Sequence, residues 1–239
     1  FGDCTIIAQH NPARIRSSAA KTDAQSIAQR PCFLCLDNLS HEQKGLSFQG
    51  YYLILTNPFP VFPLHLTIST KGHVPQRIKD FFPDMLSISR ELHDFTVFYN
   101  GPQSGASAPD HFHFQAGNKS FMPVEKALKV PGNAGDLILK NDHVSVFAVE
   151  NQLHRLINML SDNPKVLADL FPLIIDKLPG AGNSEPLLNI LCNYEAGVWR
   201  VIIFPRGKRR PSHYFRSGEA RVVVGPAAVE LGGLLVLPR

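Results

Sequence analysis

Two histidines and a glutamine alternate with two phenylalanines in the segment His111-Phe112-His113-Phe114-Gln115. Alternate side chains of a β-strand point to the same face, so the three polar residues share one face and the phenylalanines share the other. A neutral imidazole nitrogen can attack phosphorus without the repulsion that an anionic nucleophile meets. The pattern therefore indicates phosphate chemistry at a histidine. The alternative is a pair of structural or surface histidines.

A run of small residues precedes this segment. Asn100-Gly101 is followed, after two residues, by Ser104-Gly105-Ala106-Ser107. Small side chains let backbone N–H groups approach an anion closely. We therefore expect a phosphate-binding loop made of Asn100, Gly101, Ser104, Gly105, Ala106 and Ser107.

Together these residues read N-G-x-x-S-G-A-S-x-x-x-H-F-H-F-Q. This pattern resembles the active-site segment of the histidine-triad superfamily, and most of all its transferase branch. That branch contains diadenosine tetraphosphate phosphorylases, GDP-L-galactose phosphorylases and galactose-1-phosphate uridylyltransferases, which have H-x-H-x-Q where the hydrolases have a third histidine. The resemblance implies that His113 is the nucleophile and that a backbone carbonyl fixes its other nitrogen. It also implies that Gln115 donates a hydrogen bond to a phosphate oxygen.

Two cysteines lie three positions apart in Cys32-Phe33-Leu34-Cys35. A C-x-x-C turn can place two thiolates on one tetrahedral metal, and a redox pair is the competing interpretation. Uridylyltransferases of the family have a similar C-x-x-C, with one histidine after the central strand pair and the first histidine of H-x-H as further ligands. The resemblance therefore implies a structural zinc ion held by Cys32, Cys35, His73 and His111.

A basic stretch near the beginning of the chain contains Arg14 and Arg16, and the β-branched residue between them favours a short strand over residues 11–18. A solvated basic strand is one interpretation. The other is that the Arg14 guanidinium binds a phosphate or a base. The transferase relatives carry a similar N-x-x-R stretch, which favours the second interpretation.

Hydrophobic periodicity and breaker residues predict the elements around these motifs. Helices are expected over residues 21–30, 76–93, 121–130, 153–160 and 165–178. Strands are expected over residues 51–56, 65–70, 95–100, 136–139, 144–149, 190–193, 199–204 and 233–237.

The second half of the chain weakly repeats the first. Residues 190–193 resemble residues 54–57, and the strand at 233–237 then has apolar residues where the first half has histidines. We predict a catalytic lobe over residues 1–130 and a degenerate lobe over residues 131–239 that completes the same domain. The family resemblance implies an α+β fold with an antiparallel sheet, flanking helices and two histidine-triad-like lobes.

A basic cluster follows the strand at 199–204. It contains Arg206, Lys208, Arg209 and Arg210. Such a run is ordinarily a solvated turn, and the alternative is help in binding phosphate or sugar.

The composition of the chain limits which classes of function are plausible. The net charge of +4 suits an anionic substrate without requiring nucleic acid, and no apolar stretch is long enough for a membrane span. A C-x-x-C pair is typical of metal or redox sites inside cells, so we expect a cytoplasmic protein.

The resemblance implies a nucleotidyltransferase or phosphorylase. Its substrate would be a nucleoside diphosphate-sugar or a dinucleoside polyphosphate, with guanine or adenine favoured over uracil. Its acceptor would be inorganic phosphate or a sugar phosphate. A dinucleotide hydrolase and a non-catalytic zinc- or nucleotide-binding protein are the alternatives, and a homodimer is compatible with the sequence.

Overall fold

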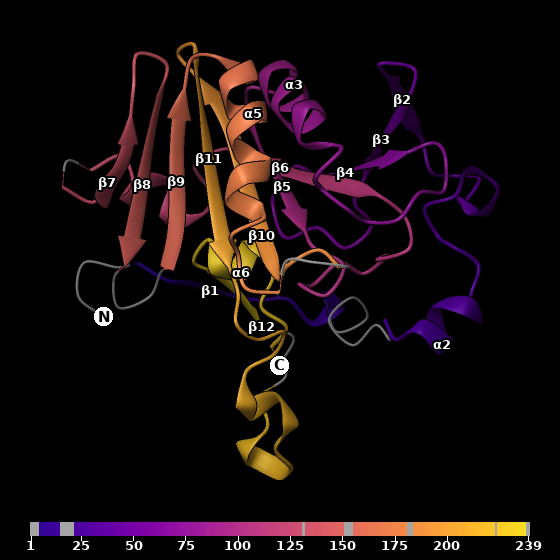
Figure 1. Cartoon of the computed structure of the whole chain (residues 1–239). Coiled ribbons are helices and arrows are strands. Elements are labelled where there is room, and N and C mark those ends of the chain that lie inside the picture. Colours follow the sequence, from indigo (N-terminus) through magenta and orange to yellow (C-terminus); the bar gives the residue numbers. More distant parts are fainter. Residues whose placement is uncertain are drawn as a thin grey trace.

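A single antiparallel sheet of ten strands forms the centre of the computed structural model (Figure 1). The structure describes residues 5–14, 22–130, 132–150, 155–180, 184–222 and 224–237. The strands follow the order β2-β3-β4-β6-β5-β10-β11-β9-β8-β7 across the sheet. They are β2 (Gly45–Phe48), β3 (Tyr52–Thr56), β4 (His65–Thr70), β5 (Phe95–Asn100), β6 (His113–Asn118), β7 (Asp136–Lys140), β8 (Val144–Glu150), β9 (Arg155–Ser161), β10 (Leu188–Glu195) and β11 (Val198–Pro205). This confirms the expected α+β class with an antiparallel sheet.

The two halves of the sheet have the same strand order. Each strand from β2 to β6 has a counterpart five labels later, and the halves meet where β5 pairs with β10. Helix α3 (Phe82–Glu91) lies between β4 and β5 in sequence, and α5 (Pro164–Ile175) lies between β9 and β10. The chain is therefore built from one repeated strand-and-helix unit.

The predicted alignment of this repeat is wrong. Residues 190–193 belong to β10, which occupies the place of β5, whereas residues 54–57 lie in and after β3. The counterpart of β6 is β11, which contains no histidine. The predicted strand at 233–237 is β12 (Leu234–Leu237), which pairs in parallel with β1 (Ile7–His10) in a separate two-stranded sheet. Short apolar strand motifs resemble one another whatever their place in a sheet, so the few shared identities pointed to the wrong partner.

One predicted helix is a strand. Residues 153–160 were expected to be helical, but β9 pairs with β8 on one side and with β11 on the other. Such apolar runs fit either structure, and here the two neighbouring strands decide. The stretch expected as a strand over 11–18 begins with a short 3-10 helix, η1 (Pro12–Arg14), and residues 15–21 lie outside the described part of the chain.

The other four helices are shorter than predicted, and α5 ends at Ile175 rather than at residue 178. Helix α3 begins only at Phe82, so the residues from Gln76 to Phe81 are free to reach the edge of β6. Helix α2 covers Ala24–Ala28, with Asp23 as its N-cap, and α4 covers Pro123–Ala127. No helix in the described residues is long and apolar enough to cross a membrane.

Two apolar clusters cover the two faces of the sheet. Helices α3 and α5 lie side by side on one face, and their Phe82 and Phe171 rings stack at 3.7 Å (Figure 1). The other face is covered by α4, by α6 (Ala228–Leu231) and by β12. Phe112 and Phe114 are fully buried in the cluster beneath α3. Because neighbouring residues of a strand point to opposite faces, this burial directs His113 towards the other face.

Candidate functional site

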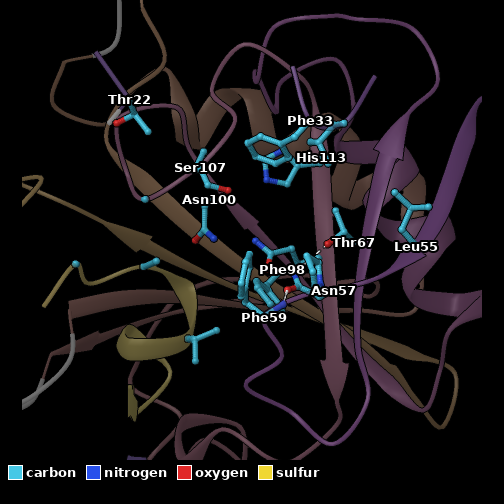
Figure 2. A pocket seen from close by; sticks show the side chains of 18 of the residues that line it. Thr22, Phe33, Leu55, Asn57, Phe59, Thr67, Phe98, Asn100, Ser107 and His113 are labelled. Atoms are coloured by element: carbon cyan, nitrogen blue, oxygen red, sulfur yellow. Dashed lines mark hydrogen bonds between the residues drawn. The ribbon is translucent and has the colours of Figure 1, made fainter. Parts of the chain in front are cut away.

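A cavity of about 460 Å³ opens on the face of β6 opposite to α3 (Figure 2). One wall comes from β3, β4 and the start of β6. A second wall comes from the loop between β5 and β6, and a third from residues 209–210, 225–227 and 229–230. His113, Gln115, Asn100 and the small residues from Gly105 to Ser107 all line it. The structure thus brings most of the predicted site into one cavity.

The His113 ring is fixed with one nitrogen free. Its Nδ1 lies 2.9 Å from the His111 carbonyl oxygen, which can only accept, so Nδ1 carries the proton and Nε2 has a free lone pair. Burial lowers the pKa of His113 to about 4, although the hydrogen bond to His111 raises it. The ring is therefore neutral near pH 7, which is the state that a nitrogen nucleophile needs.

Gln76 fixes the backbone of His113, a role that the sequence did not predict. Its Oε1 accepts from the His113 N–H at 2.8 Å, and its Nε2 donates to the His113 carbonyl at 2.9 Å and to the Asn100 carbonyl at 3.1 Å. The side chain is 1% exposed. It bridges β5 and β6 where the strands separate around the loop. The helical pattern assigned to residues 76–93 hid this contact, because Gln76 lies before the helix begins.

Gln115 is oriented by two side chains from neighbouring elements. Its Oε1 accepts from His65 Nε2 at 2.9 Å and from Asn57 Nδ2 at 3.5 Å. The Val61 N–H donates to His65 Nδ1 at 3.2 Å, so Nε2 carries the proton of the neutral ring. These contacts leave the amide nitrogen of Gln115 available to donate into the cavity. Nothing in the motif itself indicated this role for His65.

The small-residue loop offers fewer free N–H groups than expected. The Ser104 and Ala106 N–H groups donate to the Gly101 carbonyl at 2.8 and 3.4 Å, so they are used inside the loop. Within the described residues, the Gly105 and Ser107 N–H groups have no such partner. Gly105 has a φ of 105°, and a side chain there would collide with Ala227. The loop therefore remains a candidate anion site through two N–H groups rather than four.

Asn100 and Ser104 bind other parts of the protein. Asn100 Oδ1 accepts from Asn189 Nδ2 at 2.7 Å and from the Ala228 N–H at 2.9 Å, which leaves its Nδ2 for the cavity. The Ser104 carbonyl accepts from Asn189 Nδ2 and from Arg206, and Ser104 does not line the cavity. These bonds hold the third wall of the cavity against the loop.

Cys32, Cys35, His73 and His111 form a compact cluster whose ligand atoms all lie within 4.8 Å of one another. The distances from His111 Nδ1 to the sulfur atoms of Cys32 and Cys35 are 3.3 and 3.6 Å, and His73 Nδ1 lies 3.2 Å from the Cys35 sulfur. Ligands at tetrahedral zinc distances are roughly 3.5 Å apart, so the four residues fit such an ion. His111 Nε2 donates to the Thr70 carbonyl at 2.8 Å, which directs Nδ1 towards the cysteines.

An ion pair joins this cluster to the loop. Arg30 contacts Asp110 at 3.2 Å and donates to the Ser107 carbonyl at 3.3 Å, while His73 Nε2 lies 3.8 Å from Asp110. The Arg30 guanidinium also lies 4.9 Å from the centre of the Phe33 ring. No sequence pattern indicated a role for Arg30 or Asp110, because neither belongs to a spaced motif.

The basic residues singled out in the sequence differ in burial and in their contacts. The backbone of Arg14 lies in η1, and its side chain lies outside what the structure describes. Arg206 is partly buried and hydrogen-bonded, and burial lowers its pKa to about 10, so it stays charged at neutral pH. Lys208 is exposed, whereas Arg209 and Arg210 line the cavity. The simple solvated turn therefore fits the exposed Lys208, and Arg209 is exposed as well although it lines the cavity, whereas Arg206 and Arg210 are half-buried.

Comparison with known proteins identifies the fold. A family described as a domain of unknown function (DUF4922) matches residues 1–118, and no curated protein matches the sequence. A DUF4931 family protein from Bacillus cereus aligns with a TM-score of 0.52 and 15% identity, covering 79% of this chain and 98% of its own. Yeast Ap4A phosphorylase in complex with AMP aligns with a TM-score of 0.57 and 18% identity, covering 97% of this chain and 75% of its own. ADP-glucose phosphorylase from Arabidopsis thaliana with bound ADP-glucose aligns with a TM-score of 0.53 and 13% identity, covering 97% of this chain and 94% of its own. The chain therefore shares the fold of these three proteins, which is the α+β fold with an antiparallel sheet that the family resemblance implied.

Proposed function

We propose that the protein is a nucleotidyltransferase of the phosphorylase type. It would cleave a nucleoside diphosphate-sugar or a dinucleoside polyphosphate and pass the nucleotidyl group to inorganic phosphate or a sugar phosphate. The observation that carries this proposal is the state of His113, a buried neutral imidazole with Nδ1 bound to a carbonyl and Nε2 free at the cavity. That is the arrangement of an activated nitrogen nucleophile.

In the first step His113 Nε2 attacks the α-phosphorus of the substrate. A nitrogen–phosphorus bond forms, the bond from phosphorus to the leaving oxygen breaks, and the leaving group departs with the electron pair. In the second step the acceptor oxygen attacks the same phosphorus and releases His113. The nucleotidyl group is thus held covalently between two half-reactions, which predicts ping-pong kinetics.

The surrounding groups stabilise charge in this reaction. The Gln115 amide nitrogen donates to a non-bridging oxygen, and the Gly105 and Ser107 N–H groups stabilise the charge that develops at phosphorus. An amide cannot protonate a leaving group. The site therefore suits leaving groups that are stable as anions, such as a phosphate or a sugar phosphate, better than alcohols. An amide also cannot take a proton from an attacking water, so the site favours an anionic acceptor such as phosphate over hydrolysis.

The comparisons support the nucleotide part of this proposal. Structures of the same fold are described as phosphorylases of Ap4A and of ADP-glucose, and one of them is in complex with AMP. These names favour an adenine nucleotide, with a guanine nucleotide as the second candidate from the sequence pattern. A protein that binds nucleotide or zinc without catalysis is the remaining alternative.

We also propose that Cys32, Cys35, His73 and His111 bind Zn²⁺. The donor set of two sulfur and two nitrogen atoms is the usual one for a structural zinc ion, and all four positions are filled by protein. The ion would tie the Cys32–Cys35 turn to the start of β6 and so fix His111, whose carbonyl holds His113. Elemental analysis of the purified protein should show about one zinc per chain, and Cys32→Ser should lose it. A full zinc complement in that variant would contradict the assignment.

Intact-protein mass spectrometry tests the catalytic proposal. The zinc-loaded protein is mixed with ADP-glucose, GDP-hexose, UDP-hexose or Ap4A without phosphate, and is kept out of acid because a phosphoramidate is acid-labile. We expect a mass gain equal to one nucleoside monophosphate, which disappears in His113→Ala and persists in the exposed-site control His93→Ala. The mass of the adduct names the base. No adduct with any donor would favour the binding-protein alternative.

A further inference from the structure

The charged groups of the cavity lie together on one wall. Among the described residues that line it, the only cations are Arg209 and Arg210, and the only carboxylate is Glu230. The remaining lining is neutral, and it includes several large apolar side chains from the first half of the chain. These are Phe33, Leu34, Leu39, Leu55, Phe59 and Phe98.

This arrangement gives the cavity a direction. Figure 2 shows Thr22 on the side of the cavity opposite to Leu55, with Ser107 near Thr22. Arg209 Nη2 donates to Thr22 Oγ1, so the arginines belong to the Thr22 side. A base is apolar and flat, and phosphate is anionic, so the two parts of a nucleotide fit opposite ends. The leaving phosphate of the donor, which does not remain attached to the nucleoside, then lies beside Arg209 and Arg210.

Arg210 is held in place at the edge of the cavity. Its guanidinium lies 4.3 Å from the centre of the Tyr214 ring, and its Nη1 is buried so closely against Gly225 that a side chain there would collide with it. Arg210 lines the cavity through its remaining atoms. The guanidinium is therefore fixed by packing on one side and can donate hydrogen bonds to an anion from the other.

Arg206 fixes the backbone of this pair against the loop. Its Nη2 donates to the Arg209 carbonyl at 2.8 Å. Its Nη1 donates to the Pro226 carbonyl at 2.7 Å and to the Ser104 carbonyl at 3.2 Å. One guanidinium therefore joins the segment that carries Arg209 and Arg210, the third wall of the cavity and the candidate anion loop. The arginine pair is preorganised relative to His113.

We propose that Arg209 and Arg210 form the subsite for the acceptor phosphate, a phosphate dianion that is either inorganic phosphate or the phosphate of a sugar phosphate. This inference rests on the proposed function, because the subsite binds the anionic acceptor that attacks in the second half-reaction. Two guanidinium groups can bind phosphate oxygens with charge-assisted hydrogen bonds. The subsite raises the occupancy of the acceptor relative to water and so favours transfer over hydrolysis.

The test measures phosphate binding separately from catalysis. Isothermal titration of the zinc-loaded protein with inorganic phosphate, and separately with glucose 1-phosphate, is compared in Arg209→Gln, Arg210→Gln and Lys208→Gln. Lys208 is exposed, lies next to the pair and is not part of the cavity lining, so its variant matches the change in charge. Each arginine variant should bind at least about tenfold more weakly, and the lysine variant should remain within about twofold. The acceptor that binds more tightly identifies the source of the phosphate.

A second measurement links this subsite to the reaction. The nucleotidyl-His113 adduct is prepared first and then treated with acceptor. At saturating donor Arg210→Gln should still form the adduct, although it should need more donor because the leaving phosphate lies beside the arginines, and it should need at least about tenfold more acceptor for half-maximal discharge of the adduct. Arg210→Lys keeps the positive charge but loses the paired N–H donors of the guanidinium. The acceptor concentration that it needs should lie between those of wild type and Arg210→Gln, which shows that the loss in Arg210→Gln is not a folding defect.

The outcomes separate the two proposals. Equal phosphate affinity in wild type and both arginine variants, or no phosphate binding by wild type, overturns the acceptor subsite. A lower melting temperature in Arg210→Gln with unchanged phosphate affinity also overturns it, because the arginine would then only support the Tyr214 segment. Phosphate binding that depends on the arginines, without any adduct on His113, keeps the anion subsite and refutes the proposed function.

Discussion

Replacement of Gln76 by methionine tests whether this side chain holds the nucleophile in place. Methionine has nearly the same length and volume, so the change removes three hydrogen bonds and leaves no cavity. One buried N–H and two buried carbonyl oxygens, on His113 and Asn100, lose their partner. At about 2 kcal/mol for the N–H and about 1 kcal/mol for each carbonyl, the free energy of unfolding falls by about 4 kcal/mol.

Urea denaturation measures this loss. With an m-value of about 3 kcal/mol/M for a chain of this size, the unfolding midpoint should fall by about 1.3 M. The exposed Gln49, which donates only to Ser87 Oγ, is the matched control, and Gln49→Met should move the midpoint by less than about 0.3 M. The rate of adduct formation on the folded variant should fall about a hundredfold, because a small displacement of the nucleophile spoils its alignment. An unchanged midpoint together with an unchanged rate would refute the argument.

Three further predictions follow from single contacts. Burial raises the pKa of Glu185 from 4.5 to about 7, so the folded state favours the protonated carboxyl group. About 3 kcal/mol of stability that is present below pH 4.5 is therefore lost as the pH rises to 7. Chemical denaturation between pH 4.5 and 7 should show this loss in the wild type and no such loss in Glu185→Gln. His65→Phe leaves the Gln115 amide without its strongest partner, and the rate of adduct formation, followed by mass spectrometry, should fall about tenfold while donor binding stays within about threefold; equal rates would exclude the orienting role. Gly105→Ala introduces a side chain at a positive φ and against Ala227, so thermal denaturation should show a loss of about 2 kcal/mol or more; an unchanged melting temperature would contradict the close approach.

The sequence predicted those parts of the site that depend on strict spacing. Alternation in the strand brought His113 and Gln115 to one face, and spacing indicated Cys32 and Cys35 as a pair, whereas the resemblance to the uridylyltransferases added His73 and His111 to the cluster that the structure shows. Both patterns are local, or belong to a motif whose members lie far apart but are chemically rare. For this reason they can be recognised in a single chain.

The supporting residues could not be predicted in this way. Gln76, His65 and Arg30 are common residue types, and they orient the site through hydrogen bonds to residues that lie 24 to 80 positions away. The alignment of the repeat and the β9 strand failed for a related reason. An apolar run fits a strand in either half or a helix, and only the neighbouring strands of the folded sheet decide between these states.

The pairing of β5 with β10 has a consequence for synthesis and assembly. Residues 1–118, which match the DUF4922 family, contain His113 and the cluster of Cys32, Cys35, His73 and His111, yet their β5 has an unpaired edge until β10 is made. An exposed edge strand readily accepts a strand from another chain. During translation the first half of one chain can therefore pair with β10 of a second newly synthesised chain, which yields an intertwined dimer with the same ten-stranded arrangement. The two halves, expressed as separate polypeptides, should for the same reason reassemble across this seam.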